Sequence, residues 1–249
     1  MNVLIYGIGG AMGKVLLSCC KESSDVVCVC GVDKFVDKKT ISVPVYDDCS
    51  AISEKVDCII DFSNHVCIYD YLPYAIKNSI PCVIATTGYN EEELNYIAEC
   101  AKLIPILKSG NMSLGINLLL QLSKLCAKSI GDIADIEIIE HHHNKKIDAP
   151  SGTALLLADG IKKELPDSNY VLGRSGEGKR QKNDIGISAV RGGTIVGKHE
   201  VMFILNNEIV TLKHEAQSKS ILAYGSINAA RFIVGKPVGM YTMEDVFQQ

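Results

Sequence analysis

The sequence lacks three features that would each point to a particular class of protein. It has no basic run or arginine-rich segment, and its formal net charge is −4, so nucleic-acid binding is not expected. No apolar run approaches the roughly 18–20 residues of a membrane-spanning helix. The amino end, Met1-Asn2-Val3, does not show the basic region and long apolar core of a secretory signal. We expect a cytoplasmic protein without nucleic-acid or membrane partners.

Cysteine pairs with the two-residue spacing of zinc and redox motifs are also missing. The ten cysteines lie between Cys19 and Cys126, and several, such as Cys28 and Cys58, stand inside apolar runs. Reduced cysteine is small and easily buried, and it persists in reducing compartments. We therefore interpret the cysteines as core residues and expect no metal. The composition, 47% hydrophobic and 22% charged, is that of an ordinary globular protein.

The first half of the chain alternates short apolar runs with helical patterns. The expected strands are Val3–Tyr6, Val26–Val32, Val56–Ile60, Pro81–Ala85 and Leu103–Leu107, and the expected helices are Ala11–Cys20, Cys67–Lys77 and Glu91–Lys102. This alternation is typical of parallel βαβ units, in which ligands bind at the carboxyl ends of strands. Those ends carry Gly, Ser, Thr, Asn or Asp here, so the pattern predicts a polar ligand edge.

After Ser113 the pattern becomes richer in strands, which places a domain boundary near residue 112. The expected helices are Leu114–Ser129, Ala154–Leu165 and Ser218–Ile233, and the first expected strand is Ala134–Glu140. The polar, Gly-rich segment Ser168–Asn183 is expected to be a loop. Three strands of the antiparallel type are expected after it: Ile185–Arg191, Ile195–Leu205 and Glu208–His214, the last two joined at Asn206-Asn207.

The segment Gly7-Ile8-Gly9-Gly10-Ala11-Met12-Gly13 follows a strand and opens a helix, the setting of a dinucleotide-binding turn. Gly7 permits a tight turn, Gly9 and Gly10 let backbone amides approach a pyrophosphate, and Gly13 lets helix and strand pack closely. The amino end of the helix then offers unpaired N–H groups to the anion. A purely structural glycine turn is the alternative.

Asp33 lies 20 positions after Gly13, at the end of the second strand. An acidic residue at this place accepts hydrogen bonds from an adenosine ribose, whereas its neighbour Lys34 could pair with a 2′-phosphate. Strand, turn, helix and Asp33 together predict a dinucleotide site. Because Asp33 and Lys34 are adjacent, we expect both NADH and NADPH to be used, with NADH at least as good.

The run His141-His142-His143-Asn144-Lys145-Lys146 concentrates titratable side chains in an expected loop. Histidine titrates near neutrality, and a neighbouring lysine can supply a proton, so we favour an acid–base site. Zinc is one alternative, because adjacent histidines can ligate it, but no nearby Cys or well-spaced Asp or Glu completes a ligand set. A solvated charged loop is the other alternative. Lys145 has no assigned role.

The next segment, Asp148-Ala149-Pro150-Ser151-Gly152-Thr153, makes a turn and a helix start. The amides of Gly152 and Thr153, with two hydroxyl groups, form a natural carboxylate cradle. An ordinary helix cap by Ser151 is the simpler interpretation, and both can hold. The residues thus predict hydride transfer to a polarised double bond in a small anionic substrate.

Over nearly its whole length the chain resembles the dihydrodipicolinate reductase (4-hydroxy-tetrahydrodipicolinate reductase) family of the bacterial and plant lysine/diaminopimelate pathway. The resemblance rests on the glycine turn, Ala85-Thr86-Thr87-Gly88, Asn111-Met112-Ser113, the segment from Glu140 to Ala154, and Val190-Arg191-Gly192-Gly193 with Gly197-Lys198-His199. It implies that NADH or NADPH reduces the cyclic product of dihydrodipicolinate synthase, after loss of its 4-hydroxyl, to tetrahydrodipicolinate.

The resemblance also implies roles for individual residues. His142 matches the family's proton donor and acceptor, and Lys146 its second proton donor. The residues that match carboxylate contacts are His143, Lys146, Gly152 and Thr153. The residues that match cofactor contacts are Gly7, Ile8, Gly9, Gly10, Ala11, Met12, Asp33, Lys34, Ala85, Thr86, Thr87, Ser109, Gly110, Asn111 and Met112. Ala11, Ala85 and His65 replace a common arginine, glycine and proline of the family.

The fold implied is α/β: a Rossmann-type parallel-sheet dinucleotide-binding domain plus a smaller α+β mixed-sheet domain for substrate binding and oligomerisation. The first comprises residues 1–112 and 219–249, because the family's closing helix and tail return to it, and the second comprises residues 113–218. A homotetramer is also implied. Two other functions stay open: another two-domain nicotinamide oxidoreductase, such as an aspartate dehydrogenase, and a non-catalytic dinucleotide-sensing module.

Overall fold

The apolar runs of the first half form a parallel seven-stranded sheet in the computed structural model, which describes residues 1–247. Across the sheet the strands are β12 (Gly239–Tyr241), β6 (Pro105–Lys108), β5 (Cys82–Ile84), β4 (Cys58–Asp61), β1 (Asn2–Tyr6), β2 (Val27–Val32) and β3 (Val45–Tyr46). All neighbouring pairs are parallel, which confirms the predicted Rossmann-type sheet. The edge strands β3 and β12 were not predicted, because two or three residues are too few to show a pattern.

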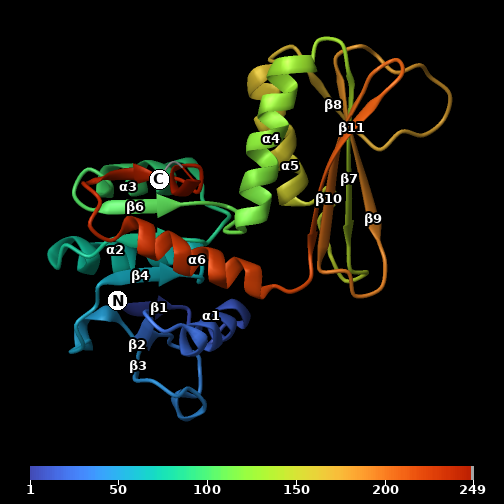
Figure 1. Ribbon diagram of the computed structural model, residues 1–249. Helices are drawn as coiled ribbons and strands as arrows, with labels where there is room; N and C mark the ends of the chain where they lie inside the picture. The colour runs from blue at the N-terminus through green and yellow to red at the C-terminus, as the bar shows by residue number, and fades with distance from the viewer. Residues whose placement is uncertain (248–249) are drawn as a thin grey trace. The chain divides into compact units, whose positions relative to one another are not determined.

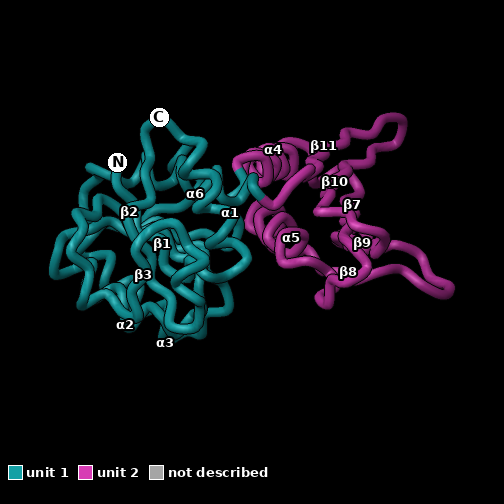
Figure 2. Tube along the Cα trace, turned by 90° about the horizontal axis from the view of Figure 1, so that it is seen from below, with its two compact units in different colours: residues 1–113, 220–249 teal, residues 114–219 magenta. Residues whose placement is uncertain are grey.

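The helices of this first sheet lie on both of its faces, as parallel strands require. They are α1 (Ala11–Glu22), α2 (Ile68–Lys77), α3 (Glu91–Cys100) and α6 (Ser220–Ile233), with short 3₁₀ helices at Lys38–Thr40, Cys49–Ala51, His65–Cys67 and Asp245–Phe247. Helix α1 contacts α6, and α2 contacts α3. In Figure 2, α6 lies above the strands and α2 and α3 below them.

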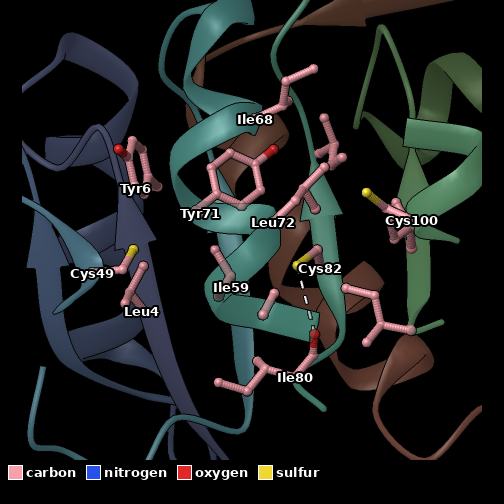
Figure 3. Close-up of a cluster of buried hydrophobic side chains, with 14 of the residues drawn as sticks. Leu4, Tyr6, Cys49, Ile59, Ile68, Tyr71, Leu72, Ile80, Cys82 and Cys100 are labelled. Carbon is pink, nitrogen blue, oxygen red and sulfur yellow. Dashed lines mark hydrogen bonds between the residues drawn. The ribbon is translucent and has the colours of Figure 1, made fainter. Parts of the chain in front are cut away.

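The core between the sheet and α2 shows what the cysteines do. Tyr71 and Leu72 of α2 are fully buried beside Cys82 of β5 and Cys49 (Figure 3). The Cys82 thiol donates to the carbonyl oxygen of Ile80, 3.7 Å away. All ten cysteines are free and eight are buried. They therefore pack as small apolar residues, as predicted.

The second half forms a five-stranded mixed sheet. Its strands in order are β11 (Ile209–Ala216), β10 (Gly197–Ile204), β7 (Asp135–His142), β9 (Asp184–Arg191) and β8 (Asn169–Leu172). Helices α4 (Leu114–Ile130) and α5 (Gly152–Glu164) pack on one face of it and enclose its apolar core (Figure 1). The β10–β11 hairpin closes with a bond from the Leu205 amide to the Glu208 carbonyl oxygen, 2.9 Å, so Asn206-Asn207 forms the predicted turn.

Two predictions for this half were wrong. Strand β9 pairs in parallel with both β7 and β8, and is not antiparallel. The chain leaves β7 through α5, a crossover that returns the following strands in the same direction. The expected loop Ser168–Asn183 contains β8, which its polar surroundings concealed. The antiparallel pairs of this sheet are those of β10 with β7 and of β10 with β11.

The contacts divide the chain into two units, which Figure 2 colours separately. Unit 1 comprises residues 1–113 and 220 onward, and unit 2 comprises residues 114–219. The domains that we drew from the sequence, 1–112 with 219–249 and 113–218, differ from these units by a single residue at each junction. Among residues 1–247, no helix is both long and apolar enough to cross a membrane.

The contact between helix α1 and the glycine turn yields a stability prediction. A Cβ atom at Gly13 would lie 2.2 Å from the Gly7 carbonyl oxygen and 2.7 Å from the Ile8 Cα. These are backbone atoms, so the helix must shift. We expect Gly13→Ala to lower the free energy of unfolding by about 2 kcal/mol, a typical cost of overpacking. Urea unfolding followed by circular dichroism measures it.

The matched control is Gly178→Ala, where an added Cβ has no neighbour within 4 Å. We expect that exposed substitution to stay within about 0.5 kcal/mol of the wild type. Equal stability of the two variants would contradict the packing role of Gly13.

Candidate functional sites in the two units

The glycine turn of unit 1 is built as a phosphate cradle requires. Gly7 follows β1 and has a φ of 81°, which favours glycine. A Cβ at Gly7 would lie 2.7 Å from the Phe62 carbonyl oxygen, and one at Gly9 would lie 2.5 Å from the Val36 side chain. Gly10 precedes α1, and among the described residues no side chain caps that helix end. The turn therefore leaves backbone N–H groups of α1 available to an anion.

Asp33 links the turn to the end of β2. Its carboxylate accepts hydrogen bonds from the backbone N–H groups of Gly9 (3.0 Å) and Phe35 (2.9 Å). A cavity of about 430 Å³ adjoins this turn, and its lining includes Gly7, Gly10, Asp33 and Lys34. A cavity of this size beside a glycine turn and an acidic residue fits the adenosine part of a dinucleotide.

The other predicted cofactor residues lie at the ends of the adjacent strands β5 and β6 or under the turn. Thr86 is buried, and its hydroxyl oxygen accepts a hydrogen bond from the Ser63 amide, 2.9 Å. The Ser109 hydroxyl donates to the Asn111 carbonyl oxygen, 2.9 Å. The side chains of Ile8 and Met112 are buried. These two residues can offer a ligand only their backbone.

In unit 2, the alternation of strand β7 brings together His142, which is a predicted site residue, and Glu140, which was not predicted. Glu140 and His142 are two residues apart, so both side chains point to the buried face of the sheet. Glu140 has no exposed surface, and its carboxylate lies 2.6 Å from the His142 Nδ1. The carboxylate fixes the proton of the imidazole on Nδ1 and leaves the Nε2 lone pair for chemistry.

Glu140 is itself held by two other elements. The Arg191 guanidinium of β9 donates to both carboxylate oxygens, at 2.7 and 2.8 Å, and the Ser151 amide donates at 2.9 Å. Burial raises the pKa of Glu140, but the hydrogen bonds from Arg191, His142 and Ser151 outweigh it and hold that pKa below its usual range. Glu140 is therefore a carboxylate in the folded protein.

The histidines beside Glu140 are kept neutral. Burial lowers the pKa of His142; Glu140 opposes this effect, and the charges of Lys146 and Arg191 add to it, so the pKa stays below its ordinary value. His199 of β10 lies next to His142, with ring centroids 5.2 Å apart, and its Nε2 lies 3.2 Å from the Ser151 hydroxyl oxygen. Burial and the neighbouring His142 lower the pKa of His199 to about 3.

In the loop after β7, the side chain of Asp148 lies beside Lys146, one of the residues that the sequence predicts to bind a substrate carboxylate. The Lys146 ammonium lies 2.8 Å from the Asp148 carboxylate. The hydrogen bond from Lys146 is the largest cause that lowers the pKa of Asp148, and it outweighs burial, which raises that pKa. One of the four predicted carboxylate-binding residues, Lys146, thus contacts a carboxylate of the protein itself.

The helix-cap interpretation of Ser151 is also confirmed. Its hydroxyl oxygen accepts a hydrogen bond from the Ala154 amide, 3.2 Å, at the start of α5. His143 lies in the same loop, and its carbonyl oxygen accepts from the Lys146 amide, 3.1 Å. Among residues 1–247, no group of three or more His, Cys, Asp or Glu side chains is arranged to hold a metal ion.

Three members of this cluster had no role in the sequence analysis: Glu140, Arg191 and His199. A signal for Glu140 was present, because it is a charged residue at a core position of an alternating strand. His199 carried the same signal in β10, where it alternates with buried Val201 and Phe203. Arg191, at the end of β9, carried none, and the pairing of β9 and β10 with β7 brings both residues to Glu140.

Comparison with known proteins covers the whole of both units. A family model described as "Dihydrodipicolinate reductase, N-terminus" matches residues 1–112, and one described as "Dihydrodipicolinate reductase, C-terminus" matches residues 115–247. A 4-hydroxy-tetrahydrodipicolinate reductase of Caldanaerobacter subterraneus is 48% identical over 100% of this chain and 99% of its own length. One of Clostridium tetani is 44% identical over 98% and 96%.

Solved structures show the same fold. A dipicolinate-bound dihydrodipicolinate reductase from Paenisporosarcina sp. TG-14 superposes with a TM-score of 0.82 at 22% identity and covers 97% of each chain. An aspartate dehydrogenase from Thermotoga maritima gives a TM-score of 0.54 at 14% identity, covering 96% of this chain and 98% of that one. At these sequence identities, the two structures support the fold and not the function.

The buried histidine cluster predicts how stability depends on pH. His199 has a pKa of about 3 when folded and about 6.5 when unfolded. Between these values the unfolded chain binds more protons, so the contribution of His199 is complete above about pH 6.5 and is lost as the pH falls toward 3. His199→Gln can still form a hydrogen bond with Ser151 but cannot titrate. Between about pH 3 and pH 6.5, we therefore expect the free energy of unfolding of this variant to fall with decreasing pH by about 1.4 kcal/mol per pH unit less than that of the wild type. Urea unfolding at several pH values measures this slope, and an unchanged slope would show that His199 is not buried as a neutral ring.

Proposed function

The chain belongs to the dihydrodipicolinate reductase family, and we propose that its two units divide the reaction, with unit 1 binding the dinucleotide and unit 2 binding the substrate. The protein is an NAD(P)H-dependent oxidoreductase that reduces 4-hydroxy-tetrahydrodipicolinate to tetrahydrodipicolinate in lysine and diaminopimelate biosynthesis. The nicotinamide supplies a hydride when bound. The remaining chemistry, which consists of binding a dicarboxylate and moving protons, falls to residues of this chain.

One observation carries the assignment of the proton chemistry: the contact of His142 with the buried Glu140 carboxylate. A neutral imidazole with its proton on Nδ1 presents an unprotonated Nε2, which can accept a proton. Loss of the 4-hydroxyl as water needs a proton delivered to that oxygen and another removed from the neighbouring carbon. We assign the removal to His142 Nε2, which returns that proton to the same carbon after the hydride has added to the ring, and the delivery to the Lys146 ammonium, so that one proton from Lys146 leaves with the hydroxyl as water.

The position of Asp148 supports the carboxylate cradle. Its carboxylate already lies 2.8 Å from the Lys146 ammonium. The amino end of α5 adds its dipole to this place. A substrate carboxylate has the same charge and shape, so it can replace Asp148 there. We assign substrate binding to His143, Lys146, Gly152 and Thr153, as the sequence predicts.

For the dinucleotide we propose the turn and strand ends of unit 1. The cradle comprises Gly7, Ile8, Gly9, Gly10, Ala11 and Met12, the ribose contacts are Asp33 and Lys34, and the contacts at the β5 and β6 ends are Ala85, Thr86, Thr87, Ser109, Gly110, Asn111 and Met112. Gly7, Gly9 and Gly13 have no space for a Cβ, so the turn packs closely against its neighbours, and we propose that its backbone N–H groups bind the pyrophosphate. We propose that NADH serves at least as well as NADPH.

We further infer that the protein is cytoplasmic and forms a homotetramer. Free, mostly buried cysteines suit a reducing compartment. Helices of unit 2 cover one face of its sheet, and the other face presents alternating side chains that include Ile139, Met202, Ile204 and Ile209. Ile209 is 60% exposed. Apolar residues on an uncovered sheet face favour self-association.

Replacing the proposed acid–base residues tests the catalytic assignment. We expect His142→Gln and Lys146→Ala each to lower kcat by about 10²- to 10⁴-fold with the coupled synthase product as substrate. His141→Gln, in the same strand as His142, and Lys145→Ala, in the same loop as Lys146, are matched controls and should keep kcat close to the wild-type value. Near wild-type turnover in both His142→Gln and Lys146→Ala would overturn the assignment and favour a non-catalytic, dinucleotide-sensing role.

The oligomeric state is tested by sedimentation. A tetramer of 27.0 kDa chains has a mass of about 108 kDa. Met202→Glu places an unpaired charge on the uncovered face of the sheet, so we expect it to lower the mass. Ile133→Asp is the control, because Ile133 is 72% exposed and lies outside the sheet. A wild-type mass of a single chain, or an unchanged mass in Met202→Glu, would contradict the proposed interface.

A further inference from the structure

A second carboxylate lines the proposed adenosine cavity and has no role so far. Asp70, in the first turn of α2, lines the same cavity of about 430 Å³ as Asp33 and Lys34. Its carboxylate lies 3.8 Å from the Lys34 ammonium. Lys34 is therefore paired inside the cavity wall and is not a free cation.

Asp70 is anchored by the core of unit 1. The Tyr6 hydroxyl donates a hydrogen bond to the Asp70 Oδ2, the oxygen that also faces Lys34. Tyr6 ends β1, is only 5% exposed, and packs against the fully buried Tyr71 (Figure 3). A buried ring thus fixes the Asp70 carboxylate at the cavity, whereas an unanchored surface carboxylate would turn away into solvent.

The charges around the cavity are consequently unfavourable to an additional phosphate. Its lining contains two carboxylates, Asp33 and Asp70, and the ammonium of Lys34. Both Asp33 oxygens already accept backbone hydrogen bonds, which keep that carboxylate at the turn. A 2′-phosphate adds nearly two negative charges, and it must compete with Asp70 for Lys34.

We propose that Asp70 is a specificity-determining residue that holds Lys34 and thereby favours NADH over NADPH. This inference rests on the proposed location of the dinucleotide in unit 1. The Lys34–Asp70 pair is partly exposed, with side-chain exposures of 57% and 34%, so its effect is moderate.

Equilibrium binding of the two cofactors to the purified protein tests the proposal without turnover. Calorimetric titration gives Kd for NADPH and for NADH, and the quantity compared is their ratio, Kd(NADPH)/Kd(NADH). We expect Asp70→Asn, which keeps the shape and removes the charge, to lower this ratio about three- to fivefold, the range of a partly exposed ion pair. The ratio of kcat/KM values should move in the same direction.

The mechanism through Lys34 makes a sharper prediction. In a Lys34→Ala background, Asp70→Asn should change the ratio by much less, because no cation remains to be released. Tyr6→Phe removes the anchor of Asp70 and should shift the ratio in the same direction as Asp70→Asn. This second variant keeps the test valid if Asp70→Asn does not fold.

Glu91→Gln is the matched control. Glu91 is an exposed acidic residue that, like Asp70, lies in the first turn of a helix, so its replacement gives the same change of net charge outside the cavity lining. We expect the ratio to stay at the wild-type value in this variant. A general loss of stability would alter the affinities for both cofactors alike, and a general effect of net charge on the 2′-phosphate would lower the ratio in Glu91→Gln as well as in Asp70→Asn.

Three results would overturn the proposal, and the third would also refute the proposed dinucleotide site. If the wild type binds NADH and Asp70→Asn leaves the ratio unchanged, the role of Asp70 is wrong and the dinucleotide site stands. The same holds if Asp70→Asn lowers the ratio equally with and without Lys34. If Asp33→Ala and Gly9→Val leave the affinity for both cofactors intact, the site itself is elsewhere.

Discussion

The buried carboxylate of Glu140 is the group on which the site of unit 2 depends. It has no exposed surface, so its charge must be satisfied by hydrogen bonds inside the protein. Arg191 binds both oxygens, and Ser151 and His142 supply further donors. These partners come from β9, the start of α5 and β7, so one carboxylate connects the neighbouring strands β7 and β9 with the start of α5, where we propose that the substrate carboxylate binds. The same contact that stabilises the carboxylate orients the imidazole.

Neutrality of His142 follows from this arrangement. Burial favours the uncharged ring, and the cations Arg191 and Lys146 reinforce it against the attraction of Glu140. In the proposed mechanism this neutral ring, at the end of β7, is the base, and Lys146, four residues later in the following loop, is the acid. The Lys146 ammonium lies 2.8 Å from the Asp148 carboxylate, which we propose that the substrate's own carboxylate replaces. Different environments thus give the two neighbouring groups different proposed roles.

The sequence predicted the parts of the molecule that local patterns determine. The βαβ alternation, the glycine turn with Asp33 and the start of α5 at Ser151 all depend on residues within about 25 positions of one another, and the structure contains each of them. What the sequence did not reveal depends on pairing between distant strands. The parallel direction of β9 and the strand β8 within a polar segment were mispredicted, and Arg191 and His199 reach Glu140 only through the register of β7 with β9 and β10. Tyr6 and Asp70, 64 positions apart, are a similar case in unit 1.

In the proposed mechanism, Glu140 fixes the proton of His142 on Nδ1 and leaves Nε2 free as a base. Nitrogen NMR of the histidine rings in the free protein at about pH 7.5 measures this tautomer directly, with His142→Gln used to assign the signals. We expect a neutral ring that is protonated at Nδ1, with an unprotonated Nε2, and a mixture of tautomers after Glu140→Gln. A ring protonated at Nε2 alone, or at both nitrogens, would contradict this mechanism.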